Sequence, residues 1–464
     1  MLATSPRCCI VPAAVLLAAL LLTPGSLAAV IIVVNTADDL GAADDGFCSL
    51  REAVDAANDD LASGSLAGEC VAGTLSDEIR FTLPVPSTIY LNYGQLVLTG
   101  DTTIAGPGSA LLRIEALGFG RHFVLWQESA LVPRTFALQG LELTGGWGVS
   151  DYQGYGAWDG GALLLNQGTV TLTDVVFADN LAPDAGAAIY EAGSTLTIER
   201  CVFRHNLVTN MYLIGAGGAI AANGGDLVIR DSTFEANEAQ GDDLGYWFHD
   251  GHGGALAAWA WGSVAIERST FVANRARGFG GAIAIGYYGA INYDVPTTIT
   301  SSTFTLNEAD TDGDGDDDGG GLKVFDNLSD TTLSNSLLAG NLDHAATTAP
   351  DLAGADIVTA GHNLIGIRHG SASATFPVGQ PNGNGDLVGN VGAPLDARLL
   401  PLAANGGPTT TAALDAASPA IDQGSCPGEV ADQRGYFGPT THTRVADAAA
   451  TNADDGCDIG AYEA

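Results

Sequence analysis

Positive charge is scarce in this sequence. Of 464 residues, 17 are lysine or arginine and 54 are aspartate or glutamate, so the formal net charge is −37. A single lysine, Lys323, is among the 17 basic residues. Nucleic-acid phosphates and anionic lipid headgroups are bound by basic surfaces. We therefore expect no nucleic-acid partner and no docking on anionic lipid, and we interpret the acidity either as a source of solubility or as a means of binding cations.

Long apolar runs are also missing after the first residues of the chain. An apolar run covers 10–22, with Arg7 before it and small residues at Ser26–Ala28. This arrangement predicts a signal peptide over 1–28, and the run is shorter than the roughly 20 residues that span a bilayer. The sequence therefore predicts Sec-type export to the extracellular space or the cell surface, with no membrane insertion of the mature chain.

Cysteine is sparse but unevenly placed. Two of the seven cysteines lie in the predicted signal peptide. In an oxidising compartment, the remaining five suggest two disulfides and one buried thiol. We expect Cys48 to pair with Cys70, Cys426 to pair with Cys457, and Cys201 to be the buried thiol.

Glycine, by contrast, is abundant, with 62 residues. Many of these glycines open a repeated block that begins Gly-Gly-Ala-aliphatic and ends Phe-x-x-Asn, and Leu338–Asn341 is a degenerate sixth ending. The residues that close the five clear blocks are Phe177 and Asn180, Phe203 and Asn206, Phe234 and Asn237, Phe271 and Asn274, and Phe304 and Asn307. Blocks of this length are typical of solenoid proteins.

Within each block, apolar residues alternate with polar ones, as Val170 and Leu172 do. This period of two predicts short strands with one buried face. The pattern predicts an all-β chain folded as a right-handed parallel β-helix over 78–398, with regular repeats over 160–341. Equivalent residues of successive coils then form ladders, and we interpret the phenylalanine and asparagine ladders as structural, because a buried asparagine can satisfy backbone groups at a corner.

The repeat itself resembles the passenger repeats of chlamydial polymorphic outer membrane proteins, through its pairing of Gly-Gly-Ala-Ile with Phe-x-x-Asn over 160–341. Those proteins are β-helical surface adhesins. The resemblance implies a surface-exposed role.

Near the N-terminus, Cys48-Ser49-Leu50-Arg51-Glu52-Ala53 resembles the signature of the CSLREA domain of bacterial secreted β-helix proteins. Ser49 and Glu52 form a capping box that predicts a short helix over 50–58. We expect 29–77 to be a cap that covers the open edge of the first coil.

The segment 399–464 resembles the choice-of-anchor type of C-terminal region. The matching pieces include Asn405–Thr409, Ser418–Asp422, Asp432–Gly435 and Cys457–Glu463. Such regions normally precede a surface anchor, and we expect this one to be a short cap at the C-terminal end of the solenoid.

Aromatic residues gather in insertions between the asparagine of one block and the glycines of the next, and at a second point after Gly-Gly-Ala. Aromatic rings stack on sugars and nearby carboxylates bind hydroxyls, so these loops are candidates for recognising a polysaccharide or cell-surface glycan. The alternative is that the aromatic side chains pack on their own coil. The candidate ligand-binding residues are Trp147, Tyr152, Tyr155, Trp158, Asp242, Asp243, Tyr246, Trp247, Asp250, His252, Trp259 and Trp261.

The densest acidic run, 310–318, places carboxylates at alternate positions with glycines between them. This spacing resembles the first half of a calcium-binding loop, although the bidentate glutamate of an EF-hand is missing. The run is either a loose Ca²⁺ site or a solvated acidic loop. The candidate ligands are Asp310, Asp312, Asp314, Asp316 and Asp318.

An enzyme is the competing class of function. Gly251-His252-Gly253 resembles a fragment of polygalacturonases, which share the pectin-lyase-like β-helix. The accompanying aspartates are not at the family spacing, and we interpret Arg200 and Arg268 as turn residues that pair with neighbouring glutamates. We therefore assign no catalytic residues and favour a secreted or surface adhesin. The alternative is a polysaccharide lyase or glycoside hydrolase.

Overall fold

The computed structural model describes residues 29–41, 44–126, 133–149, 158–209, 215–241, 251–260, 262–288, 291–292, 294–313, 318–325, 330–344, 351–354, 356–368, 374–426, 429, 431–437, 440–441 and 456–464. The predicted signal peptide lies outside the described residues. No helix in the described part of the chain is long and apolar enough to cross a membrane.

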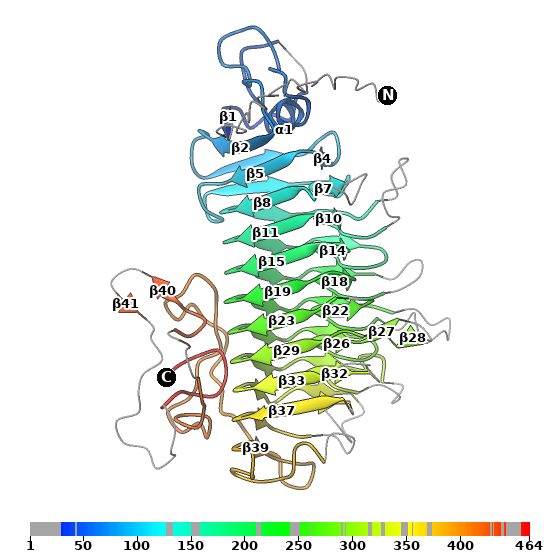
Figure 1. The fold of residues 1–464 in the computed structure, drawn as a ribbon, viewed down its shortest axis with the longest axis vertical. Helices are drawn as coiled ribbons and strands as arrows, with labels where there is room; N and C mark the ends of the chain where they lie inside the picture. The colour runs from blue at the N-terminus through cyan, green and yellow to red at the C-terminus, as the bar shows by residue number, and fades with distance from the viewer. Residues whose placement is uncertain are drawn as a thin grey trace, which may run out of the picture.

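The described strands form a right-handed parallel β-helix (Figure 1). Sheet A has the order β1 (Val30–Val34), β2 (Ser76–Phe81), β5 (Asp101–Ala105), β8 (Thr135–Gln139), β11 (Thr169–Thr173), β15 (Thr195–Glu199), β19 (Leu227–Arg230), β23 (Val264–Glu267), β29 (Thr297–Thr300), β33 (Thr331–Ser334) and β37 (Ile357–Gly361). Sheet B has the order β3 (Ser87–Tyr90), β6 (Leu112–Glu115), β9 (Glu142–Thr144), β12 (Val176–Ala178), β16 (Val202–Arg204), β20 (Thr233–Glu235), β24 (Thr270–Val272), β30 (Thr303–Thr305), β34 (Leu337–Leu338), β38 (Leu364–Ile365) and β39 (Leu387–Val388).

Two further parallel sheets complete the coils. Sheet C has the order β4 (Leu96–Leu98), β7 (Phe123–Trp126), β10 (Leu163–Asn166), β14 (Ile189–Ala192), β18 (Ile220–Asn223), β22 (Leu256–Trp259), β26 (Ile283–Ile285), β32 (Leu322–Val324) and β36 (Leu352–Ala353). Sheet D has the order β13 (Leu181–Ala182), β17 (Leu207–Val208), β21 (Glu238–Ala239), β25 (Arg275–Ala276), β31 (Glu308–Ala309) and β35 (Leu342–Asp343). Antiparallel pairs join β27 (Tyr287–Tyr288) to β28 (Ile291–Asn292) and β40 (Tyr436–Phe437) to β41 (Thr440–Thr441).

The coils stack in the register that the repeat predicts. Val170 pairs with Leu196 and Leu172 with Ile198 in neighbouring strands of sheet A, and all four side chains are fully buried. The intervening threonines of β11 point outward. The alternation of apolar and polar residues therefore stacks the buried apolar side chains of successive coils into columns. Together these columns form a core that runs through the solenoid.

A column of stacked phenylalanine rings lies inside sheet B. Neighbouring rings are nearly parallel, with centroids 4.6–4.8 Å apart. This spacing follows from the distance of about 4.8 Å between hydrogen-bonded strands. The members are Phe177, Phe203, Phe234, Phe271 and Phe304.

The asparagines that close the blocks form a buried hydrogen-bonded ladder. In a typical rung, Asn237 donates from Nδ2 to the Phe203 carbonyl at 3.0 Å and to Asn274 Oδ1 at 2.9 Å. Its own Oδ1 accepts from the backbone N–H and Nδ2 of Asn206. Each side chain thus satisfies the corner of its neighbour, which is the structural role that we expected of this motif.

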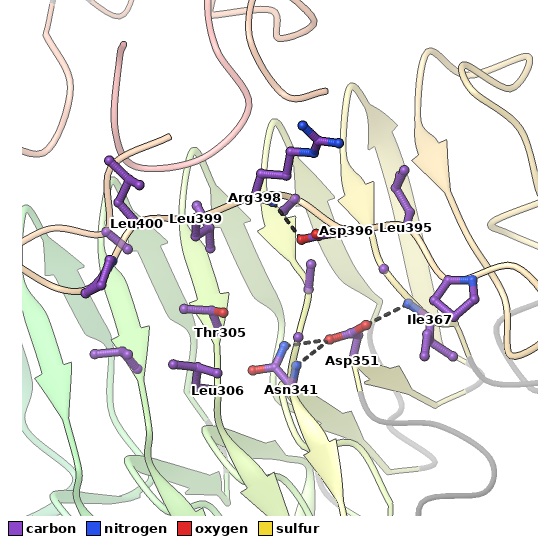
Figure 2. Close-up of a pocket in the computed structure, with 18 of the residues that line it drawn as sticks. Thr305, Leu306, Asn341, Asp351, Ile367, Leu395, Asp396, Arg398, Leu399 and Leu400 are labelled. Atoms are coloured by element: carbon purple, nitrogen blue, oxygen red, sulfur yellow. Dashed lines mark hydrogen bonds between the residues drawn. The ribbon is translucent and has the colours of Figure 1, made fainter. Parts of the chain in front are cut away.

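The ladder has a direction, because every oxygen accepts from the coil before it, and it ends at a carboxylate. Asp351 Oδ1 accepts from the backbone N–H and Nδ2 of Asn341, and Asp351 Oδ2 accepts from the Ile367 N–H (Figure 2). A second ladder of serines on the same axis passes through Ser336 and Asn363 and ends at Asp386. The last rung of each ladder accepts hydrogen bonds from N–H donors and donates none. An aspartate carboxylate, which has acceptors alone, fits this position.

The N-terminal segment contains the predicted helix, α1 (Leu50–Asp59), with both hydrogen bonds of the capping box between Ser49 and Glu52. Arg51 joins the helix to the first coil through an ion pair with Asp39 at 2.9 Å and a bond to the Gly94 carbonyl at 2.8 Å. β1 lies in the segment that we expected to be a cap over the first coil. It is the first strand of sheet A, because Ile32 and Val34 alternate into the core.

The C-terminal segment, residues 399–464, corrects the expectation of an end cap. Its described residues lie along the side of the solenoid, over the outer face of sheet B (Figure 1). Gln433 accepts from Thr270 Oγ1 at 2.6 Å and donates to Thr233 Oγ1 at 2.9 Å. Farther along the axis the outward residues become leucines, such as Leu337, which pack with Leu414 and Ile459. The outer face of sheet B is apolar enough there to bind this segment.

Both expected disulfides are present, between Cys48 and Cys70 and between Cys426 and Cys457. Cys201 is a buried free thiol. Burial raises the pKa of Cys201 to about 12, so the thiol is inert as a nucleophile at neutral pH.

Candidate functional site

The insertions between blocks begin and end on one edge of the solenoid. The N–H of a block-opening glycine donates to the carbonyl of the residue just before the equivalent glycine in the next coil. Gly160 donates to the Ala185 carbonyl at 3.0 Å, Gly217 to His252 at 2.9 Å and Gly253 to Phe279 at 3.0 Å. We call this column the insertion edge; its described members are residues 158–160, 184–186, 215–217, 251–253, 278–280 and 318–319.

The block-opening glycines are required at this edge by the backbone. Gly160 and Gly217 have φ of +61° and +67°, in the left-handed region that L side chains rarely adopt. At the second position, a Cβ on Gly218 would lie 2.1 Å from the Gly254 carbonyl oxygen. The Gly-Gly signature therefore reports a tight corner from which the loops project.

Asp159, Asp184 and Arg121 form a buried cluster of ionisable side chains at the start of this edge. Arg121 Nε donates to the Asp159 carbonyl oxygen at 2.8 Å, and Arg121 Nη1 donates to Gln95 Oε1 at 3.1 Å. The Asp184 N–H donates to the Trp158 carbonyl at 3.2 Å. Burial, and then the charge of Asp184, raise the pKa of Asp159 to about 8, although Arg121 opposes the shift.

This cluster was missed in the sequence analysis. Asp159 directly precedes Gly160, and Asp184 lies two residues before Gly186, so the repeat register brings the two aspartates onto neighbouring coils. Aligning the block openings would have revealed the pair. Composition and local motifs alone do not show that both carboxyls are buried.

The candidate tryptophans next to this cluster are half-buried. Trp147 donates its backbone N–H to the Gly120 carbonyl at 2.9 Å, and its strand-like bridge to Leu181 ties it to the next coil. Trp158 adopts φ of +73° beside Asp159. Tyr152 and Tyr155 lie outside the described residues.

The next group of candidates is packed rather than exposed where the structure describes it. Trp259 is 3% exposed and packs on Ala185, Ala216 and Ala221. The expectation that Trp259 is an exposed sugar platform is therefore corrected, because small residues on the outer face of sheet C leave room for its ring. The candidates that lie outside the described residues are Asp242, Asp243, Tyr246, Trp247, Asp250 and Trp261.

His252 is also packed, at 6% exposure. Its Nδ1 accepts from the Phe279 N–H at 3.2 Å, and its ring lies 5.4 Å from Phe279 and 5.9 Å from Phe325. Lys323 Nζ lies 4.6 Å from the centroid of Phe279 and 5.3 Å from that of Phe325. The expectation that His252 is exposed for ligand binding is therefore corrected. Three successive coils bring His252, Phe279 and Phe325 into one aromatic cluster around Lys323.

In the acidic run, the described aspartates already have partners. Asp312 pairs with Arg277 at 2.8 Å, Asp318 pairs with Lys323, and Asp310 is fully buried. Asp314 and Asp316 lie outside the described residues. Within the part of the chain that the structure describes, no three or more His, Cys, Asp or Glu residues are grouped as metal ligands. Calcium binding remains a prediction.

Arg200 and Arg268 form ion pairs with the neighbouring Glu199 and Glu267 at 3.5 and 3.6 Å, as we expected of turn residues, and each also pairs with an aspartate. Arg200 Nε lies 2.9 Å from Asp174 and Arg268 Nε lies 2.7 Å from Asp231. Each pair with an aspartate joins two neighbouring coils. The ion pairs of these arginines therefore hold neighbouring coils of the solenoid together.

A sequence model of the family described as "Right handed beta helix region" matches residues 139–338. The chain is also similar to the "Probable autotransporter YfaL" of Escherichia coli (strain K12), with 28% identity over 137 residues, or 27% of this chain and 11% of that protein. The matched part thus spans about a tenth of the length of that relative. No solved structure matches the chain.

Proposed function

We propose that the protein is a secreted or surface-exposed β-helix adhesin that binds glycans along its insertion edge and performs no catalysis. The observation that carries the proposal is the stacking of the insertion stems on one edge of the solenoid. Loops that start from one rigid edge form a continuous surface, and function commonly resides in such loops. The half-buried Trp147 and Trp158 and the acidic Asp159 and Asp184 lie at its N-terminal end.

Four resemblances support a surface location. The matched relative is named an autotransporter, and the CSLREA-like, polymorphic-outer-membrane-protein-like and choice-of-anchor-like segments resemble parts of secreted or surface-attached proteins. Acidic composition agrees with a solvated extracellular protein. The export route is part of the proposal.

The test is a glycan array probed with the whole exported chain and with Trp158→Ala and Trp247→Ala. Tyr93→Ala is the matched control, because Tyr93 is an exposed aromatic residue outside the insertion edge. We expect each tryptophan variant to bind about fivefold more weakly and the control to keep the wild-type affinity, since a stacked ring contributes about 1 kcal/mol. Unchanged binding by both tryptophan variants would sink the glycan proposal.

The alternative is a polysaccharide lyase or glycoside hydrolase, and one observation favours it. Burial and the neighbouring charge of Asp184 raise the pKa of Asp159 to about 8, and a carboxyl with a raised pKa next to a second carboxylate is the pairing that general acid–base chemistry uses. Reducing sugars and unsaturated uronates should be measured over a panel of polysaccharides. Turnover that Asp159→Asn abolishes would replace the adhesin with an enzyme.

We also propose that the 310–318 loop binds Ca²⁺. The alternating carboxylates support it, and the ion pairs of Asp312 and Asp318 compete with it. Titration calorimetry with CaCl₂ tests the proposal. Absence of heat together with an unchanged melting temperature would dismiss the site.

A further inference from the structure

A cavity of about 490 Å³ lies between the wall of the solenoid and the segment 394–402 that crosses it (Figure 2). Its floor comes from the ends of sheet B strands in successive coils, where Val272 pairs with Thr305 and is followed by Ala339 and Gly366. Three steps of about 4.8 Å separate these four coils, so the floor is about 14 Å long. An extended chain of about four residues has this length.

The crossing segment is held in place by its backbone. The Leu395 N–H donates to the Gly366 carbonyl at 3.0 Å, and the Leu400 N–H donates to the Ala413 carbonyl at 2.8 Å. Leu395, Leu399 and Leu400 line the cavity from this segment (Figure 2). The cavity is therefore a built groove with an anchored roof.

The groove favours an apolar occupant. Its floor and roof are mostly aliphatic, and the carboxylate of Asp351 is already engaged by Asn341 and Ile367. At its mouth Leu306 is 58% exposed and Leu400 is 45% exposed. Exposed leucines around an apolar groove mark an interaction site on a soluble surface.

The charge of the chain decides between the classes of apolar occupant. A net charge of −37 repels fatty-acid carboxylates, anionic lipid headgroups and a second copy of the same chain. The two charged residues at the rim, Asp396 and Arg398, are opposite in sign. The preference for a positively charged occupant therefore comes from the net charge of the whole chain. A polypeptide can combine an apolar stretch with fixed positive charge on both sides.

We propose that the groove between 394–402 and the ends of β24, β30 and β34 binds an apolar stretch of a partner polypeptide that is flanked by lysine or arginine. This interaction is independent of glycan binding, because the groove lies at the sheet B side of the coils and the insertion edge precedes sheet C. The protein would then join a glycan to a protein partner.

The experiment uses the full chain and a fluorescein-labelled peptide in which a leucine and valine stretch is flanked by lysine pairs. Fluorescence anisotropy at low salt measures its binding. Matched peptides carry serine or glutamate pairs in place of lysine. We expect the lysine peptide to bind at least about tenfold more tightly than the glutamate peptide, and its affinity to fall as salt is added.

Leu306→Arg and Leu400→Arg test the position of the groove. Both residues are exposed, so the fold should tolerate the change, and a charge at the mouth should weaken binding about tenfold, or about 1.4 kcal/mol. Leu75→Arg is the matched control, because Leu75 is exposed in the N-terminal segment. Circular dichroism checks that each variant is folded.

Several outcomes overturn the proposal. The first is no binding of the lysine peptide by the folded chain, and the second is equal binding of the glutamate peptide. A third is wild-type affinity in both arginine variants. Self-association in sedimentation that Leu400→Arg abolishes would assign the groove to a second copy instead.

Discussion

Replacing Asn274 with alanine removes one rung from the middle of the asparagine ladder. The Asn274 side chain takes part in four hydrogen bonds. It accepts from the backbone N–H and Nδ2 of Asn237 at 3.0 and 2.9 Å. It donates to the Phe234 carbonyl at 3.0 Å and to Asn307 Oδ1 at 2.9 Å. Because Asn274 is fully buried, water cannot replace these partners.

The expected cost follows from the four lost bonds. At about 1 kcal/mol each, the free energy of unfolding should fall by about 4 kcal/mol. The matched control is Asn92→Ala, because Asn92 is exposed and makes a bond of 3.1 Å to the Tyr90 carbonyl. We expect that control to change the free energy of unfolding by less than about 0.5 kcal/mol.

Urea denaturation followed by circular dichroism and by tryptophan fluorescence measures the difference. Coincident transitions are needed, since solenoids can unfold coil by coil. If Asn274→Ala costs no more than Asn92→Ala, the ladder does not stabilise the solenoid, and the structural role that we give to Phe-x-x-Asn is wrong.

Three further predictions concern other parts of the molecule. Burial raises the pKa of Glu191 to about 8, so between about pH 4 and 8 the folded chain keeps a proton that the unfolded chain releases. The free energy of unfolding should therefore fall as the pH rises through this range. Urea titrations at several pH values measure this profile, and Glu191→Gln should flatten it. Ser49→Ala removes the N-cap of α1 and should lower the free energy of unfolding by about 1 kcal/mol, whereas an unchanged midpoint would contradict the capping argument. Gln433→Ala breaks the contacts with Thr233 and Thr270 and should speed proteolysis of the C-terminal segment, and equal digestion rates would show that these contacts do not hold it.

Much of the fold was predictable because local and regularly repeated sequence patterns specify the solenoid. Alternation at Val170 and Leu172 predicts strands and their buried face, and the spacing of Phe-x-x-Asn predicts the register between coils. The capping box at Ser49 and Glu52 predicts α1, and the positions of the cysteines predict both disulfides. Each of these signals lies within a few residues or recurs at a regular interval.

The candidate site was less predictable, because exposure depends on neighbours from other coils. Trp259 and His252 are aromatic residues in or beside insertions, which favours an exposed role from sequence alone. In the structure, Ala185 and Ala216 leave room for the Trp259 ring, and Phe279 and Phe325 surround His252. The same repeat that predicts the ladders also brings Asp159 and Asp184 onto neighbouring coils, but the burial of both carboxyls follows only from how the coils stack.

The right-handed parallel β-helix, its core columns, its polar ladders and its acidity could be predicted from the amino-acid sequence, because they follow from periodic side-chain patterns and from composition. The position of the C-terminal segment could not, because it depends on long-range packing. The C-terminal segment contacts Thr233, Thr270 and Leu337 of the solenoid. Its residue Gln433 lies more than a hundred positions from Thr233 and Thr270 in the sequence, and no local sequence pattern marks these pairings. The groove under 394–402 exists for the same reason, since a cavity between two segments is a property of how they pack.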